Sequence, residues 1–337
     1  MKKTLLICNS NMFIPYVLTE LLEHKDKEYI IISDIGNIID FINELNIGNI
    51  ITFKYEIGRV FTFFIEKHRI KAFLSNYIIE KVVFYHAEFG GFANWLLLKF
   101  AKSNVRIEYC KIFESIPMPE VKWYNGWRLK IREFIYYNYF PIILDDGIRY
   151  FPSLPCSFFR KIKAINIKTN INYHLINDLL KCYIQKLNID CKILLLSGFV
   201  VYDNIVTKNE YINKINNIID VIGKENLCLK LHPRYNDLHG VEQELKQIPQ
   251  NIPGSILIDS FDIYIGHSST MLVEVAQRGK IAISFLYIME MNSKDNQEQL
   301  YNFLQNRLDG KGEILYPKNI DEFEQIIKVS TPIRTKN

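Results

Sequence analysis

Two stretches decide the fold: LCLKLHPR at residues 227–234 and IYIGHSST at residues 263–270. Each opens with an apolar run, which predicts a buried strand, and each continues into polar side chains. A helix-like segment at 271–278 follows the second stretch. Ligands of open α/β sheets bind outside the carboxyl ends of the strands. The two stretches therefore predict an α/β sheet with a polar site at its carboxyl edge.

Outward from these stretches, short apolar runs alternate with helical patterns along the whole chain. A second group of elements opens with a strand at 192–196 and a helix at 209–222. Further strands are predicted at 4–8, 29–33, 50–53, 81–85 and 105–109, with helices between them. Such alternation is typical of βαβ units and of largely parallel, doubly wound sheets.

The chain is long enough for two domains, each with its own core. We predict an N-terminal α/β domain over 1–160 and a C-terminal α/β domain over 191–290. Residues 161–190 are expected to form an interdomain passage and a helix, and residues 291–337 closing helices and a tail. The segment 151–171, which holds prolines and a basic run, is predicted to be irregular.

Amino-acid composition and net charge exclude several classes of protein. The 337 residues are 48% hydrophobic and 23% charged, as in a folded globular protein. A net charge of +4 is small for this length, so it permits an anionic ligand but does not argue for nucleic acid. The six cysteines form no CxxC pair and are expected to be reduced thiols, and the scattered histidines predict no metal site. Because no apolar stretch resembles a signal peptide or a membrane span, we predict a cytoplasmic chain.

The segment 123–140 interleaves basic and aromatic residues on a predicted helix. That pattern is typical of a peripheral contact with a membrane surface, here the cytoplasmic face of the inner membrane, or with a lipid-linked substrate. The alternative is a core helix whose lysines and arginines point to solvent, and it is favoured because the two faces are not strongly segregated.

A pair of carboxylates, Asp145 and Asp146, follows the apolar run 141–144 and precedes Gly147. Neighbouring carboxylates disfavour each other's ionisation, so one of them is a candidate general base. For the tripeptide alone, an ordinary Asp-Gly turn is the favoured interpretation.

His232 has basic neighbours, Lys230 and Arg234, and Pro233 restrains its backbone to an extended conformation. A lone histidine at the end of a strand is more often structural. The basic neighbours favour contact with a phosphate group, whose departing oxygen a protonated imidazole can stabilise.

Three hydroxyl residues, Ser268, Ser269 and Thr270, stand where a helix begins. One of them suffices as an N-cap. Together with the N–H groups of the first turn they would also bind a phosphate, and the two roles are compatible. Glu274, one turn further on, either faces the same site or supports the first turn.

The dinucleotide and P-loop glycine motifs and the hydrolase elbow G-x-S-x-G are all missing from the sequence. Two α/β domains, with carboxylates in the first and a histidine and hydroxyls in the second, fit a GT-B glycosyltransferase. In that fold two Rossmann-like domains face a cleft. The acceptor would bind the N-terminal domain and the nucleotide sugar the C-terminal one.

The order of these motifs resembles that of bacterial sialyltransferases: two acidic residues and a glycine, then His-Pro, then a serine pair. The opening Leu5-Leu6-Ile7-Cys8-Asn9 and the context of His232 look most like glycosyltransferase family 52, which includes lipooligosaccharide and capsule sialyltransferases.

The resemblance implies a role for each matched position. Asp146, or its neighbour Asp145, would be the general base on the acceptor hydroxyl. His232 would assist departure of the CMP phosphate, which Ser268 and Ser269 would bind. Members of such families use CMP-sialic acid with inversion and without an obligatory metal, so no cofactor is expected.

One segment departs from the family pattern. Relatives often place a Glu just after a Pro between the His-Pro and serine motifs, where it holds the nucleotide ribose. Here residues 252–257 read IPGSIL and contain no carboxylate. Other carboxylates that could reach the site are Asp259, Asp203 and Glu210.

Overall fold

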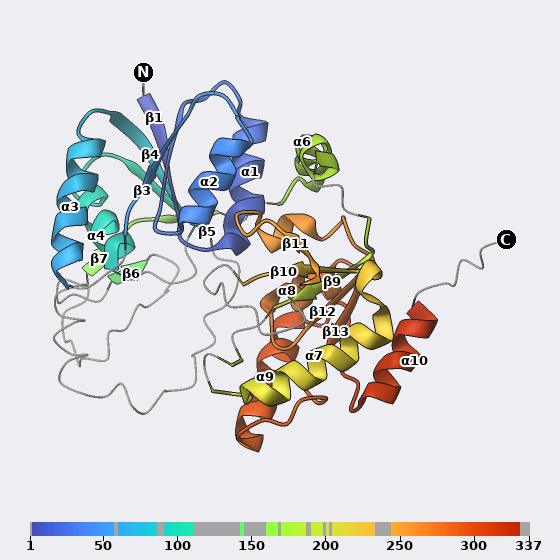
Figure 1. Cartoon of the computed structure of the whole chain (residues 1–337). Helices are drawn as coiled ribbons and strands as arrows, with labels where there is room; N and C mark the ends of the chain where they lie inside the picture. Colours follow the sequence, from blue (N-terminus) through green and yellow to red (C-terminus); the bar gives the residue numbers. More distant parts are fainter. Residues whose placement is uncertain are drawn as a thin grey trace. The chain divides into compact units, whose positions relative to one another are not determined.

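The computed structural model describes residues 2–56, 60–85, 91–110, 142–144, 160–167, 170–186, 190–197, 200–201, 204–232 and 244–330. The chain divides into two compact units, Met1–Ile176 and Asn177–Asn337. Each unit contains an open six-stranded parallel sheet with helices (Figure 1).

The sheet of the first unit runs in the order β3-β2-β1-β4-β5-β8. Its strands are β1 (Lys2–Cys8), β2 (Tyr29–Ser33), β3 (Ile50–Lys54), β4 (Ile78–Tyr85), β5 (Arg106–Cys110) and β8 (Ile165–Asn166). This is the strand order of the Rossmann fold, in which the chain builds outward in one direction and then in the other. All residues of β2 are buried, as expected for a parallel strand that is covered on both faces.

The helices of the first unit cover both faces of its sheet. They are α1 (Ile14–Glu23), α2 (Gly36–Glu44), α3 (Val60–Leu74) and α4 (Gly91–Phe100). Helices α3 and α4 share one apolar core with the sheet, where Phe63 and Leu96 pack with Leu5 and Ile7. Figure 1 shows α1 and α2 on the other side of the sheet.

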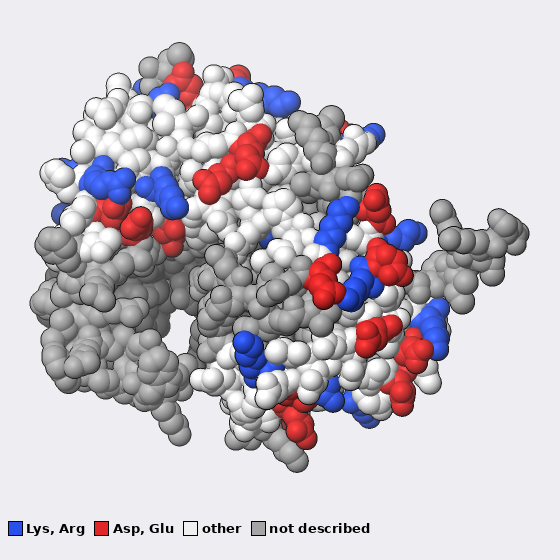
Figure 2. All heavy atoms as spheres, in the orientation of Figure 1, with Lys and Arg blue, Asp and Glu red and all other residues white. Residues whose placement is uncertain are grey.

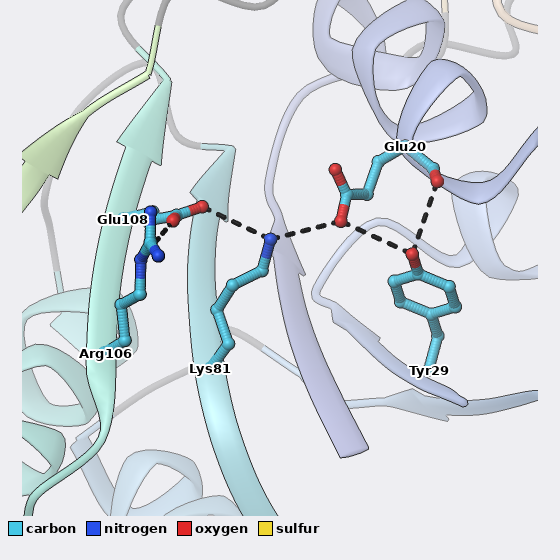
Figure 3. Close-up of polar contacts among 5 residues, drawn as sticks. All are labelled: Glu20, Tyr29, Lys81, Arg106 and Glu108. Atoms are coloured by element: carbon cyan, nitrogen blue, oxygen red, sulfur yellow. Dashed lines mark hydrogen bonds and ion pairs between the residues drawn. The ribbon is translucent and has the colours of Figure 1, made fainter. Parts of the chain in front are cut away.

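A chain of polar contacts crosses this unit near the amino ends of its strands (Figure 3). Lys81 on β4 lies 3.1 Å from Glu20 of α1 and 3.3 Å from Glu108 of β5, which also pairs with Arg106 at 2.6 Å. Tyr29 donates to the Glu20 carboxylate at 3.3 Å. Because ligands of such sheets bind at the opposite, carboxyl edge, this network is structural.

The second unit repeats the same strand order, β11-β10-β9-β12-β13-β14. Its strands are β9 (Ile193–Leu196), β10 (Leu227–Lys230), β11 (Lys246–Ile248), β12 (Ile263–Gly266), β13 (Ile281–Ser284) and β14 (Ile314–Leu315). Its helices are α7 (Lys208–Ile222), α8 (Thr270–Gln277), α9 (Lys294–Leu308) and α10 (Ile320–Ser330). Helix α6 (Tyr173–Lys186) spans the division between the units.

The predicted α/β class and the parallel sheets are confirmed, but the expectation of irregular structure is wrong for residues 160–166. That segment contributes β8 to the first sheet and β7 (Arg160–Ile162), which pairs with β6 (Ile142–Leu144). The helix expected between the strands at 50–53 and 81–85 is α3, which ends at Leu74.

The cysteines differ from expectation in one pair. Cys191, just before β9, and Cys228 on the adjacent β10 form a disulfide, with Cα atoms 6.0 Å apart. The prediction of reduced thiols is therefore wrong for this pair. Cys8 and Cys110 are free and buried.

Several predicted features lie outside the described residues: the basic aromatic segment 123–140, the candidate bases Asp145 and Asp146, and Asp203, Pro233 and Arg234. Within the described ranges no helix is long and apolar enough to cross a bilayer.

Candidate functional site

The site is built at the topological switch point of the second sheet. Strands β9 and β12 are neighbours, but β9 leads through α7 to β10 on one side, whereas β12 leads through α8 to β13 on the other. The two connections diverge at the carboxyl ends of these strands, which is where open α/β sheets bind ligands. The residues that follow β12 and β10 here are those predicted from sequence.

Ser269 is the N-cap of α8. Its Oγ accepts a hydrogen bond from the N–H of Met271 at 3.3 Å, and its carbonyl accepts from Leu272 at 3.0 Å. Thr270 is the first residue of the helix. The helix therefore starts at the carboxyl edge of β12, where its dipole favours an anion. The capping role of Ser269 is confirmed, and phosphate binding remains a prediction.

His267 lies between β12 and the serine pair, and no role was predicted for it from the sequence. Its side chain is 1% exposed, and burial lowers the pKa of the ring to about 4, so the ring is neutral. Nδ1 lies 3.1 Å from the Ser268 Oγ, and the ring packs edge-on against Phe285. Ser284, at the end of β13, donates to the His267 carbonyl at 2.5 Å.

Lys230 ends β10 with its side chain buried. Its ammonium donates to the carbonyl oxygens of Leu231, Pro249 and Gln250 at 3.3, 3.4 and 3.3 Å. A lysine ammonium has three N–H donors, so these contacts account for all of them. Burial lowers the pKa of Lys230 to about 8. In this structure Lys230 joins the end of β10 to the loop after β11, and its predicted contact with the donor stays untested.

His232 lies two residues after Lys230 and is half-buried. Its carbonyl accepts a hydrogen bond from the side-chain amide of Gln250 at 3.0 Å. Since β9 separates β10 from β12, the ends that carry His232 and Ser268 are two strand spacings apart, roughly 10 Å. The phosphate of one nucleotide and the groups attached to it can span that distance.

The alternative carboxylates have structural partners. Asp259 precedes β12 at its amino end, pairs with Arg278 at 2.7 Å and accepts from Asn177 at 2.8 Å. Glu210 lies in the first turn of α7, at the carboxyl edge, and accepts from the N–H of Glu290 at 3.0 Å. Of the two, only Glu210 is at the edge where a ligand would bind.

Glu274 lies in the middle of α8. Burial raises the pKa of its carboxyl to about 8, although Arg278 opposes the shift. A carboxyl group with this pKa carries little negative charge at neutral pH.

Within the described ranges, no three His, Cys, Asp or Glu side chains converge as a metal site. Acidic and basic side chains of the described residues are interspersed on the face shown in Figure 2, and neither sign forms a broad patch there. A polyanion such as nucleic acid finds no wide basic footprint on that described surface.

No family model matches the chain, and no curated protein matches it by sequence. Solved structures do match. The wall teichoic acid polymerase TagF has a TM-score of 0.51 and 13% identity over 98% of this chain and 82% of that one.

Two further structures match less closely. UDP-GlcNAc 2-epimerase from Methanocaldococcus jannaschii has a TM-score of 0.48 and 13% identity, over 100% of this chain and 94% of that one. A sialyltransferase from Photobacterium damsela has a TM-score of 0.47 and 11% identity, over 94% of this chain and 81% of that one.

The two Rossmann-ordered sheets, together with the likeness to TagF, give this chain the GT-B fold, as predicted. Identities this low carry no information on donor or acceptor.

Proposed function

We propose that the chain is an inverting sialyltransferase. It moves sialic acid from CMP-sialic acid to a terminal galactose-type sugar of a bacterial surface glycan, in lipooligosaccharide or capsule biosynthesis. The order of the motifs around Asp146, His232 and Ser268 supports this donor and reaction, and the GT-B fold is compatible with them.

One observation carries the proposal. Two features of the second unit lie at one carboxyl edge of a Rossmann-ordered sheet: a capped helix start with Ser268 and Ser269, and His232 just after β10. Helix N–H groups and hydroxyls bind phosphate oxygens without any added charge. An imidazole at the same edge, two strand spacings away, would supply the proton or positive charge that a departing phosphate requires.

In the proposed reaction the acceptor hydroxyl oxygen bonds to the anomeric carbon of sialic acid as the bond from that carbon to the CMP phosphate oxygen breaks. The electron pair of the broken bond stays on the phosphate oxygen, which His232 stabilises or protonates. Asp146, or Asp145, takes the proton of the acceptor hydroxyl. Because the acceptor attacks directly, the anomeric configuration inverts.

Pro233, Arg234, Lys230 and Thr270 complete the proposed donor site. Arg234 would add a positive charge near the phosphate, and Pro233 would hold the His232 backbone extended. Lys230 would support the donor site through its hydrogen bonds to the loop after β11. These groups provide the charge stabilisation in the proposed reaction, so we expect turnover without an added metal.

A different nucleotide donor is favoured by one feature. The segment where relatives carry a ribose-binding Glu has Gly254 after Pro253, and a Cβ at Gly254 would lie 2.6 Å from the sulfur of Met271 in α8. A side chain at position 254 would therefore require the flexible end of the Met271 side chain to move. The alternative donor is a UDP sugar or another nucleotide sugar. The alternative class of protein is a non-catalytic glycan- or nucleotide-binding protein.

The proposed location is the cytoplasm, with the segment 123–140 as a candidate peripheral contact with the inner membrane or a lipid-linked acceptor. The acceptor domain would be the first unit, and the donor domain the second.

Calorimetric titration with CMP, UDP, TDP and GDP tests the donor. We expect CMP to bind at least tenfold more tightly than UDP, TDP or GDP, and we expect Ser269→Ala to weaken CMP binding. Tighter binding of UDP would favour the alternative donor. Binding of CMP without turnover on any acceptor would favour the non-catalytic protein.

A further inference from the structure

His267 is a buried histidine whose two ring nitrogens have different surroundings. Nδ1 lies 3.1 Å from the Ser268 Oγ, a distance at which one of the two groups donates a hydrogen bond. Nε2 is also buried, yet it has no hydrogen-bond partner among the residues that the structure describes. A neutral imidazole carries its single proton on one nitrogen, so the position of that proton decides which group donates.

The two tautomers differ in what they leave unpaired. With the proton on Nε2, a buried N–H donor has no acceptor, and the Ser268 proton is used on Nδ1. With the proton on Nδ1, only an acceptor lone pair at Nε2 is unpaired. Buried donors without acceptors are rarer than acceptors without donors, so the second tautomer is favoured.

We propose that His267 is a positioning residue, which donates its Nδ1 proton to the Ser268 Oγ and so directs the Ser268 hydroxyl proton toward the phosphate of the donor. The identity of that acceptor rests on the proposed function, whereas the tautomer does not. In this arrangement Ser268 accepts from the protein and donates to the ligand.

The surroundings of His267 hold the ring in place. Its carbonyl accepts from Ser284, and its ring packs against Phe285, whose N–H bonds to the Gly266 carbonyl at 3.0 Å. The ends of β12 and β13 thus fix both the main chain and the ring of His267. A fixed ring offers Ser268 one donor at one position, which pre-orders the hydroxyl before a ligand binds.

Two matched variants separate the roles of the ring nitrogens. In His267→Asn the amide nitrogen is two bonds from Cβ, as Nδ1 is, so the donor to Ser268 is kept. In His267→Gln the amide is one bond further out, at the level of Nε2, so that donor is lost. Both variants are neutral and polar, and thermal melting is used to check that each is folded.

The first arm of the test is the tautomer. In protein labelled with ¹⁵N-histidine, the two ring-nitrogen shifts of a neutral histidine report which nitrogen is protonated, and His267→Asn assigns the signals by removing them. We expect a protonated Nδ1 and a bare Nε2. A protonated Nε2 would overturn the inference whatever the binding data show.

The second arm is binding of CMP, with cytidine as the ligand that lacks the phosphate. We expect His267→Asn to keep CMP affinity within about threefold and His267→Gln to lower it about tenfold, the usual effect of one hydrogen bond to a charged group. Cytidine affinity should be the same in both. Ser268→Ala should cost about tenfold in the Asn variant and less than about twofold in the Gln variant.

The outcomes separate this inference from the proposed function. Equal loss of CMP affinity in the Asn and Gln variants overturns the inference while leaving CMP binding at the site intact. If the wild-type protein binds CMP no better than cytidine, the proposed phosphate site fails, and with it the acceptor assigned to Ser268.

Discussion

The side-chain amide of Gln250 donates a hydrogen bond to the main-chain carbonyl of His232 at 3.0 Å. Lys230, two residues before His232, donates to the carbonyls of Pro249 and Gln250. The segment Lys230–His232 is therefore attached at two points to the loop after β11. Its position depends on residues that are nearly twenty positions further along the chain.

Lys230→Met tests this attachment. The methionine keeps an unbranched side chain of similar length but removes three N–H donors, which leaves partly buried carbonyls without partners. We expect a loss of about 2 kcal/mol in the free energy of unfolding and a lower kcat, measured by urea denaturation and by the rate of donor cleavage. Lys192→Met is the matched control, because the Lys192 side chain is 68% exposed and its ion pair with Asp262 is worth little. Equal effects of the two substitutions would contradict the attachment.

His232→Ala tests the proposed leaving-group role. Removing a group that donates to the departing phosphate should lower the rate of CMP release by a factor of about 10² to 10⁴, as is usual for general acid catalysis. CMP affinity should change by only a few-fold, because the helix start and the serines remain. Single-turnover kinetics and calorimetry measure the two quantities separately. Unchanged turnover would count heavily against the proposed mechanism.

The burial of His267 predicts how stability depends on pH. Its pKa is about 4 in the folded chain and about 6.5 when unfolded, so the unfolded state binds the extra proton between these values. The free energy of unfolding should therefore fall as the pH drops from about 6.5 to 4, by about 3 kcal/mol from this residue. His267→Asn should lack this part of the dependence, whereas His68→Asn, at an exposed position, should keep it. Parallel pH curves for wild type and His267→Asn would be the contrary result.

The polar network of the first unit should matter for stability alone. Lys81→Met leaves Glu20 and Glu108 near each other without the cation that lies between them. We expect a loss of about 2 kcal/mol in unfolding free energy, less than for a fully buried pair because the Lys81 side chain is 19% exposed. Since the network lies at the amino ends of the strands, kcat at saturating substrate should stay unchanged. A large fall in kcat in folded enzyme would show that the network reaches the reaction.

The fold could be predicted from sequence because its strands are continuous apolar runs. Runs such as 29–33 and 193–196 are covered on both faces, and parallel sheets require such strands. Strands β8 and β11 were missed because they are short and their exposed residues leave no apolar run. Edge strands of this kind are fixed by pairing with a neighbour rather than by their own composition.

The candidate site could be predicted only in part. The serines and His232 stand at strand ends, and that position is visible in the sequence. The structural role of Lys230 could not be predicted from the sequence, because its ammonium donates to carbonyls that lie 19 and 20 residues away in the chain. His267 was passed over because its burial depends on Phe285 and Ser284 from the next strand.

Release of CMP from CMP-sialic acid in the presence of EDTA, measured with and without lactose as acceptor, tests the proposed donor and reaction most directly. We expect release that lactose stimulates and that needs no metal, with sialyl-lactose as the product. No release, together with no binding of CMP by calorimetry, would contradict the proposed donor.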